Sequence, residues 1–367
     1  MSDSAGRVKG RDRRLTIAGH RLQNQRITQL GPRGPEKLVA WLGAVQAQEY
    51  GPTKWSLGLR LPPGATDAAL ERALNQGRIL RTHVLRPTWH FVTREDIRWM
   101  LELTAPQVHR RMAPYDRLLG LDADVKIRAT RLIERALGEG RCLTRQELGA
   151  RLLRAGLPGT TTHLAHLAMY AELEGVICSG PRRGRQFTYA LLADRAPRSQ
   201  RFSREEALAE LALRFFRSHG PATVRDFAWW SGLKAADAKR GLEMNPAKSQ
   251  EVDGVKYWTI GRSPTNSKTR TGVHLLPGFD EYLVAYRDRH AVPHSLYANP
   301  SFRLAAGALV IGGQVAGGWR TIPEGKRLLV EVETPRQLGG GERRALAQAA
   351  ARYGRFLGVP VSLAVRR

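Results

Sequence analysis

The sequence is poor in cysteine and has no long apolar run. Its two cysteines, Cys142 and Cys178, lie far apart in 367 residues, and neither belongs to a set of ligands with zinc-like spacing. They therefore predict no disulfide framework and no metal site, and we expect two buried thiols in a reducing compartment. No apolar run approaches the about 18 residues that cross a bilayer, and none follows the charged N-terminus. We expect a soluble, cytoplasmic protein.

Acidic residues are also scarce relative to basic ones. The chain has 33 Asp and Glu against 59 Lys and Arg, a formal net charge of +26. Such a surplus favours a polyanionic partner, nucleic acid first of all. A GC-rich genome would explain the preference for Arg over Lys, but not the excess over acids. With 42% hydrophobic residues and eight Trp, the chain can bury a core and is no disordered polycation. It lacks both a Walker loop and a G-x-G-x-x-G between strand and helix, so we expect no cofactor.

Helix-start signals and changes of hydrophobic period divide the chain into repeated units. Pro35 opens one helix, Thr66 caps another, and residues 79–84 and 88–92 form a hairpin. Helices followed by a hairpin predict a winged helix. The same order begins again at the capping boxes of Thr144 and Ser203. Beyond a linker at 261–271, strands and one helix follow. We predict an α+β fold with a loose basic arm (1–14), three tandem winged-helix modules (15–107, 108–196, 197–262) and a C-terminal β-rich element (263–367).

Two glutamines close the first apolar helical pattern, which covers residues 38–45. Gln46 and Gln48 stand just before the stop signal Gly51–Pro52. An amide both donates and accepts hydrogen bonds, so the pair could fix a water molecule or contact a base edge, but it cannot take a proton near neutral pH. Residues two apart lie on nearly opposite sides of a helix that turns about 100° per residue. For the two amides to cooperate, the helix must end or distort at Ala47 or Gln48. The alternative is two ordinary polar residues at a helix end.

Four further segments are candidate DNA-contacting surfaces, and each has a purely structural alternative. The basic tip at residues 181–185 suits a wing that touches phosphate, or a solvated turn. Residues on the first hairpin could face DNA, although a lone His on a strand is more often structural. Residues 279–289 crowd acids, aromatics and arginines together, either as a DNA contact oriented by acids or as a local ion-pair network. A Gly-rich hairpin at 312–320 could probe the minor groove or form a plain turn. The candidate contacts are His83, Arg86, Trp89, His90, Arg182, Arg183, Arg185, Tyr286, Arg287, Arg289, Trp319 and Arg320, with Asp280 and Asp288 in support.

The glutamine segment, the first hairpin and the segment 279–289, in this order, resemble the winged-helix DNA glycosylases of the AlkZ and YcaQ type. They are residues 42–48, 80–90 and 279–289. The resemblance implies three winged helices and a β-rich element around a basic DNA channel, with catalysis by a Gln, an apolar residue, and Gln or Asp. Here these are Gln46, Ala47 and Gln48, and the second Gln places the chain on the AlkZ side. Members of that side are associated with self-resistance in producers of DNA-alkylating natural products.

The chemistry implied by the resemblance explains the absence of an acid. Alkylation at purine N7 or N3 makes the base cationic, so it departs without protonation. Gln48 would then orient a water near C1′, and Gln46 would hold that water or the sugar. We expect a monomeric, nucleoid-associated, monofunctional DNA glycosylase acting on double-stranded DNA with bulky N-alkylated purines or interstrand crosslinks. The main alternative is a non-catalytic winged-helix DNA-binding regulator. An RNA-binding protein is a third, although aromatic platforms for single strands are lacking.

Overall fold

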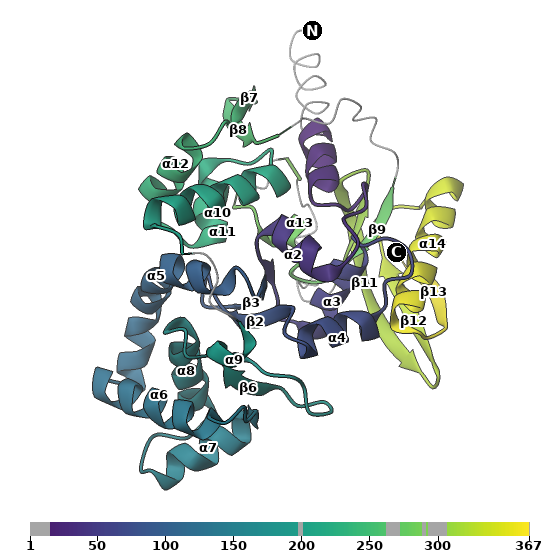
Figure 1. The fold of residues 1–367 in the computed structure, drawn as a ribbon. Helices are drawn as coiled ribbons and strands as arrows, with labels where there is room; N and C mark the ends of the chain where they lie inside the picture. Colours follow the sequence, from purple (N-terminus) through teal and green to yellow (C-terminus); the bar gives the residue numbers. More distant parts are fainter. Residues whose placement is uncertain (1–14, 197–200, 262–271, 288–290, 293–306, 367) are drawn as a thin grey trace.

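The computed structural model describes residues 15–196, 201–261, 272–287, 291–292 and 307–366 (Figure 1). The predicted arm, the linker, Asp288 and Arg289 lie outside the described residues. Within these residues, no three His, Cys, Asp or Glu side chains gather as a metal site requires. None of the helices in this part of the chain is both long and apolar enough to cross a bilayer. Both cysteines are free, but only Cys178 is buried as predicted, since Cys142 is half-exposed.

The first unit packs three helices around a small antiparallel sheet, and residues 15–24 form a further helix ahead of them. Thr66 caps its last helix by accepting the N–H of Ala69, as predicted. The sheet has the strand order β1-β3-β2, so that β1 is an edge strand. Its elements are α2 (Pro35–Leu42), β1 (Val45–Gln46), α3 (Tyr50–Gly58), α4 (Asp67–Asn75), β2 (Ile79–His83) and β3 (Trp89–Thr93).

The prediction that the helix continues through Val45 is wrong. Helix α2 ends at Leu42, because Gly43 follows with φ 84°, a backbone conformation that breaks the helix and that glycine adopts without strain. The chain is then extended, and Val45 and Gln46 pair with Phe91 and His90 of β3. The break that we predicted near Gln48 therefore comes several residues earlier.

The second unit has the same element order as the first: helix, strand, two helices and a hairpin. Helix α5 (Ile97–Leu118) joins the units and runs through residue 107, where the first module was predicted to end. The sequence analysis missed both α5 and the following α6. The capping box of Thr144 and Glu147 is confirmed. The elements are α6 (Ala123–Leu137), β4 (Leu143–Thr144), α7 (Arg145–Arg154), α8 (Thr161–Leu173), β5 (Ile177–Ser179), β6 (Thr188–Leu191) and α9 (Leu192–Arg195).

The third unit again places three helices before a hairpin. Ser203 forms the predicted cap at the start of its first helix, and Thr223 caps the second in the same way. An isolated bridge between Ala222 and Trp258 takes the place of the short strand that precedes the second helix in the other units. The elements are α10 (Arg204–Ser218), α11 (Val224–Ser231), α12 (Ala235–Glu243), β7 (Lys248–Val252) and β8 (Val255–Thr259).

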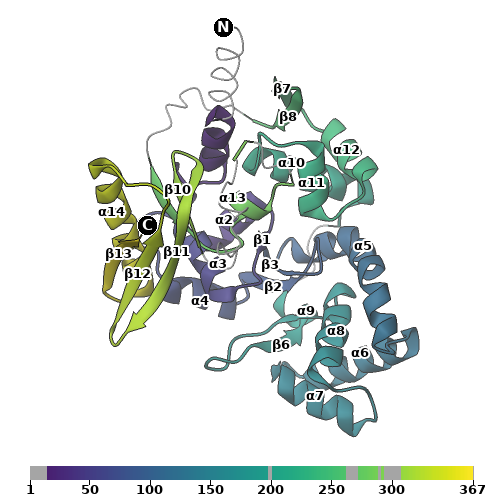
Figure 2. The ribbon, with the colours of Figure 1, turned by 180° about the vertical axis from the view of Figure 1, so that it is seen from behind.

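The C-terminal part is a five-stranded sheet that shares a hydrophobic core with the first unit. Residues of both, such as Leu38 and Val330, belong to one buried cluster, and the Trp55 indole N–H donates to the Leu275 carbonyl at 2.8 Å. Figures 1 and 2 show the second unit at the far end of the molecule from this sheet. The elements are β9 (Val273–Leu276), α13 (Glu281–Val284), β10 (Gly307–Ile311), β11 (Gln314–Glu324), β12 (Arg327–Glu333), α14 (Gly340–Leu357) and β13 (Val361–Arg366), in strand order β13-β12-β11-β10-β9.

Candidate active site

Neither glutamine lies on a helix, because Gln46 belongs to β1 and Gln48 lies at a bend just beyond that strand. The Ala47 N–H donates to the Trp89 carbonyl at 2.6 Å, which continues the ladder beyond β1. Ala47 is fully buried, whereas Gln48 is exposed. The end of β1 and the bend at Gln48 thus separate the two amides.

Gln46 is held by three neighbours, two of them through its backbone. Its N–H donates to Oε1 of Glu281 at 2.6 Å, and its carbonyl accepts from the Thr53 hydroxyl at 3.1 Å. Its side-chain Oε1 accepts from Nη2 of Arg86 at 2.8 Å. The residue is only 7% exposed. Position and amide orientation are therefore both determined by the surrounding protein.

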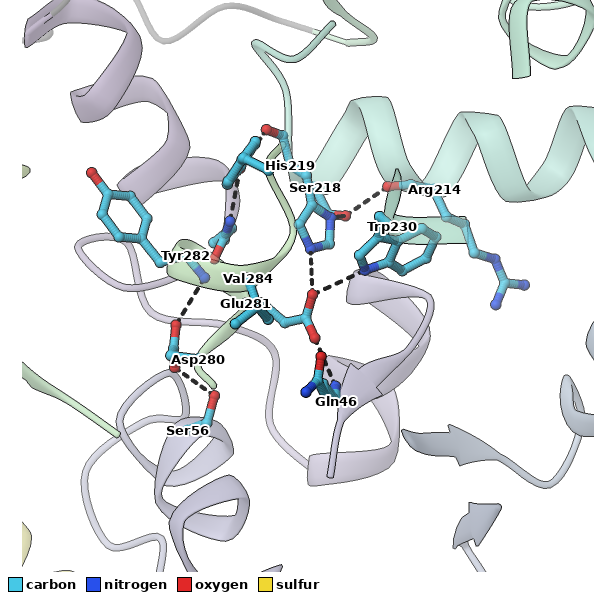
Figure 3. A network of polar contacts seen from close by, with 12 residues as sticks. Gln46, Ser56, Arg214, Ser218, His219, Trp230, Asp280, Glu281, Tyr282 and Val284 are labelled. Carbon is cyan, nitrogen blue, oxygen red and sulfur yellow. Dashed lines mark hydrogen bonds and ion pairs between the residues drawn. The ribbon is translucent and has the colours of Figure 1, made fainter. Parts of the chain in front are cut away.

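Behind Gln46, Glu281 is the centre of a buried polar network (Figure 3). The side chain is fully buried, and its Oε2 accepts from the Trp230 indole at 2.9 Å and lies 3.4 Å from Nε2 of His219. Burial alone would raise the pKa of Glu281, but the contacts with His219 and the Gln46 N–H, and the charge of Arg86, lower it to about 2. Burial also lowers the pKa of His219, so its imidazole is neutral at neutral pH. The carboxylate is therefore ionised beneath β1.

In front of Gln46 lies a pocket of about 710 Å³ that is rich in arginine. Arg86 lines it beside Gln46, and Arg111, Arg225 and Arg287 contribute from three other elements. The Trp229 side chain also lines it, is 45% exposed, and is anchored by an indole N–H that donates to the Val284 carbonyl at 3.0 Å. Among the described lining residues none is Asp, Glu or His. The pocket can thus bind anions and stack a planar group, but it offers no carboxylate or imidazole for proton transfer.

Gln48 lies beside a second pocket, of about 460 Å³, between the first and second units. Its Oε1 is 3.4 Å from the Trp89 N–H, and its carbonyl is 3.5 Å from Nη2 of Arg81. The Trp89 ring lines this second pocket with the guanidinium of Arg81 at 4.1 Å from its centre. Arg145 and Phe187 line it as well. The glutamine segment thus runs between two pockets that both contain arginine and aromatic side chains, and the second pocket also has Glu172 in its lining.

A comparison with protein families identifies this architecture. The model of a family described as DNA glycosylase AlkZ-like matches residues 39–356. The chain belongs to the AlkZ-like DNA glycosylase family. It is accordingly an enzyme of the class that cleaves N-glycosyl bonds, and the resemblance drawn from the sequence is confirmed.

Two comparisons with known proteins give matches along most of this chain. One is an interstrand DNA cross-link repair glycosylase of Streptomyces sahachiroi, 24% identical over 333 residues that make up 83% of this chain and 86% of that protein. The other is the solved structure of Streptomyces sahachiroi DNA glycosylase AlkZ, with a TM-score of 0.76 and 22% identity, covering 95% of this chain and 99% of that one. The latter match shows that this AlkZ-like chain has the AlkZ fold.

Several predicted DNA contacts lie in the interior of this AlkZ-like enzyme instead. Tyr286 is 2% exposed, and its hydroxyl donates to the His219 carbonyl at 2.7 Å. His90 is fully buried, and burial, reinforced by Arg86, lowers its pKa to about 3. Trp319 lies within β11, away from the hairpin turn, and donates to the Leu276 carbonyl at 2.7 Å. These three predictions of DNA contact are corrected, because each side chain packs in the core.

The remaining predicted contacts lie in several separate places and differ in exposure. His83 is mostly buried against Glu172, whereas Arg287 is exposed at the first pocket. At the basic tip, Arg182 lies over Tyr50 and Phe187, Arg183 pairs with Glu147 at 2.8 Å, and Arg185 lines the second pocket. Arg320 is exposed and pairs with Glu331 at 2.5 Å. Asp280 supports the site from beneath, through a bidentate ion pair with Arg60 and a hydrogen bond from Ser56.

The sequence analysis missed four residues of the site: Glu281, Trp229, Arg111 and Arg225. Glu281 belongs to the quoted motif 279–282, where its neighbour Asp280 was chosen instead. For Trp229 the sequence did contain a signal, namely that Trp230 follows it directly. Two adjacent helical positions cannot both face one core, so one of the two indoles had to be exposed. Nothing in the local pattern distinguished Arg111 or Arg225 from the many other exposed arginines.

Proposed function

We propose that this enzyme excises N7- or N3-alkylated purines from double-stranded DNA, including bulky adducts and interstrand crosslinks. The observation that carries the proposal is the composition of the pocket at Gln46. Its described lining has four arginines and a Trp but no Asp, Glu or His. A glycosylase without an acid at hand cannot protonate a leaving base, so its substrate must carry the positive charge already. An alkylated purine does.

The reaction then needs little from the protein beyond positioning and charge stabilisation. The C1′–N9 bond breaks with its electron pair leaving on the purine, which becomes neutral. The sugar is left as an oxocarbenium ion. Water held by Gln48 adds to C1′ and releases its proton to solvent, which yields an abasic site and the free modified base. The ionised Glu281 beneath β1 adds a negative potential that favours the cationic transition state.

The architecture supports the same proposal. We infer that the three repeated units of helices and hairpin are winged-helix modules that surround a DNA channel with the C-terminal sheet. Exposed arginines on α5, α11 and after α13 meet at one pocket and would neutralise phosphates on either side of the lesion. The S. sahachiroi relative is named for interstrand crosslink repair. We propose a related role here, as a monomer in the cytoplasm, with self-resistance to a DNA-alkylating natural product as its setting.

The proposal is tested by incubating the enzyme with a duplex that contains one defined N7-alkylguanine, followed by alkaline cleavage of the abasic site. Wild type is expected to release the base. Gln48→Ala should bind the duplex normally and lose excision by a factor on the order of 100 or more. Gln250→Ala, an exposed glutamine on β7, is the matched control and should behave as wild type. Tight binding without release by wild type from several alkylated duplexes would instead favour a DNA-binding regulator.

A further inference from the structure

Arg86 is a buried cation whose side chain donates a hydrogen bond to a neutral amide. It is 8% exposed, and its Nη2 donates to Oε1 of Gln46 at 2.8 Å. Its Nε has no hydrogen-bond partner within the described residues, although it is buried. Burying a guanidinium is costly, and burial lowers the pKa of Arg86. The opposing charge that supports it is Glu281, which raises that pKa. Two buried charges therefore lie around Gln46, one facing its side chain and one its backbone.

The contact with Arg86 determines which end of the Gln46 amide faces the pocket. A guanidinium has donors and no acceptor, so only the carbonyl oxygen of the amide can face it. The amide dipole is then aligned, with its negative end toward the cation. Gln46 also lines the pocket, and its only side-chain hydrogen bond among the described residues is the one that its Oε1 accepts from Arg86, which leaves its Nε2 without an acceptor there. The group that Gln46 presents to the pocket is consequently an NH₂ donor.

The orientation of the Gln48 amide, in contrast to that of Gln46, is not fixed by a charged neighbour among the described residues. Its Oε1 makes one long contact, 3.4 Å from the Trp89 N–H, and no charged group among the described residues donates to it. A carbonyl oxygen has a second lone pair that remains available for a water O–H. The two amides of the motif are therefore not equivalent. One is fixed as a donor and the other is free to accept.

We propose that Arg86 is a positioning residue that divides the roles of the two glutamines, an inference that rests on the proposed glycosylase function. Held by Arg86, Gln46 donates to an acceptor atom of the leaving purine. This hydrogen bond strengthens as the base loses its positive charge, so it favours the transition state over the ground state. Gln48 accepts the hydrogen of the attacking water. Donation from Gln46 to the sugar ring oxygen would oppose the oxocarbenium ion, which excludes that oxygen as its partner.

The first test is a double-mutant cycle in single-turnover excision of N7-alkylguanine at saturating enzyme. Arg86→Met removes the donor while keeping much of the volume, and should slow excision by roughly 10- to 100-fold. The Kd for the undamaged duplex should change less than about twofold, since Arg86 acts through Gln46. In a Gln46→Ala background, Arg86→Met should have almost no further effect on the rate. Arg86→Lys keeps a donor and a charge and should restore part of the rate.

The second test does not depend on the folding of an Arg86 variant. Gln46→Glu keeps an oxygen for Arg86 but has no NH₂ to offer, so it should be at least as slow as Gln46→Ala. A Gln46→Glu enzyme as fast as wild type would overturn the donor role. Rate losses that multiply in the double variant, or an Arg86→Met effect confined to Kd, would overturn the positioning role while the glycosylase function stands. If wild type releases no base, the proposed function fails and this inference fails with it.

Discussion

Oε1 of Glu281 accepts the backbone N–H of Gln46 at 2.6 Å, although the two residues are 235 positions apart in the sequence. Strand β1 is an edge strand, and its inner edge pairs with β3. Glu281, at the start of α13, occupies the outer edge. The segment that follows the third unit therefore completes the hydrogen bonding of β1. This explains why two motifs so distant in the chain occur together.

Glu281→Gln should impair both stability and excision. The substitution keeps the shape but places an NH₂ group where N–H donors of Gln46 and Trp230 converge, and it removes the charge that balances Arg86. We expect a loss of roughly 2–4 kcal/mol in the free energy of unfolding. Excision should fall more than tenfold, because β1 loses its outer anchor.

Urea unfolding monitored by tryptophan fluorescence measures the first effect, and single-turnover excision measures the second. Glu243→Gln is the matched control, since Glu243 is an exposed residue at the end of α12 whose only recorded partner is Lys239. An unfolding curve for Glu281→Gln that superimposes on the wild-type curve would contradict the anchoring role.

Asp280→Asn should destabilise the fold more than it affects chemistry. Asp280 and Arg60 form a bidentate pair at 2.7 and 2.8 Å with both side chains fully buried. Removing one partner leaves an uncompensated buried guanidinium, at a cost of about 3–5 kcal/mol. Chemical unfolding should show the loss. The variant protein that remains folded at low temperature should still bind duplex DNA; loss of binding with unchanged stability would argue for a direct contact.

The local signals in the sequence predicted where helices begin, and they did so for a physical reason. Thr66, Thr144 and Ser203 each accept an N–H three residues ahead, a contact that needs no tertiary structure. The end of α2 was harder to predict from the sequence, because Val45 suits a buried helical position as well as a buried strand position. Only the pairing of β1 with β3, whose strands lie some 45 residues apart, decides between them.

The local sequence pattern likewise could not predict which side chains of an element face the core. Tyr286 and Arg287 are adjacent residues of one motif, yet the first is packed under Arg21 and the second lines the pocket. The Gln motif and the segment 279–282 were identifiable from the sequence as a conjunction. That Glu281 rather than Asp280 contacts Gln46 follows from how α13 docks against β1, which depends on the whole fold.

Trp229→Ala should weaken the binding of alkylated DNA. The exposed indole faces the pocket beside Gln46 and is held in place by the Val284 carbonyl. An aromatic face attracts a planar cation, and base stacking on such a residue is worth about 1–3 kcal/mol, or roughly 5- to 150-fold in Kd. Trp229→Phe should retain most of the affinity. Fluorescence anisotropy with matched alkylated and undamaged duplexes measures both, and equal loss on the two duplexes would assign Trp229 to general DNA binding instead.

The excision rate should be nearly independent of pH between about 6 and 9, because the groups around Gln46 do not titrate there. The pKa of Glu281 is about 2 and that of His90 about 3, while burial lowers the pKa of His219. The measurement uses an N7-alkyladenine, which has no ring N–H to lose and therefore keeps its positive charge across this range, unlike an N7-alkylguanine, whose N1–H dissociates around neutral pH. A general acid would make the rate fall as pH rises; a single-turnover rate that drops tenfold per pH unit would therefore contradict the mechanism.

Stability, in contrast, should decline in acid. The folded-state pKa of Glu281 lies below its unfolded value of 4.5, so its contribution is present above pH 4.5 and is lost as pH falls toward 2. His90 acts in the same direction: the unfolded chain binds a proton near 6.5, the folded chain only near 3, so stability falls as pH drops from 6.5 to 3. Urea midpoints should decrease steadily below pH 6.5. His90→Gln should flatten the upper part of that decline, between pH 6.5 and 4.5, where Glu281 does not yet titrate in either state. A midpoint that stays constant down to pH 4.5 in wild type would show that His90 is not held neutral in the core.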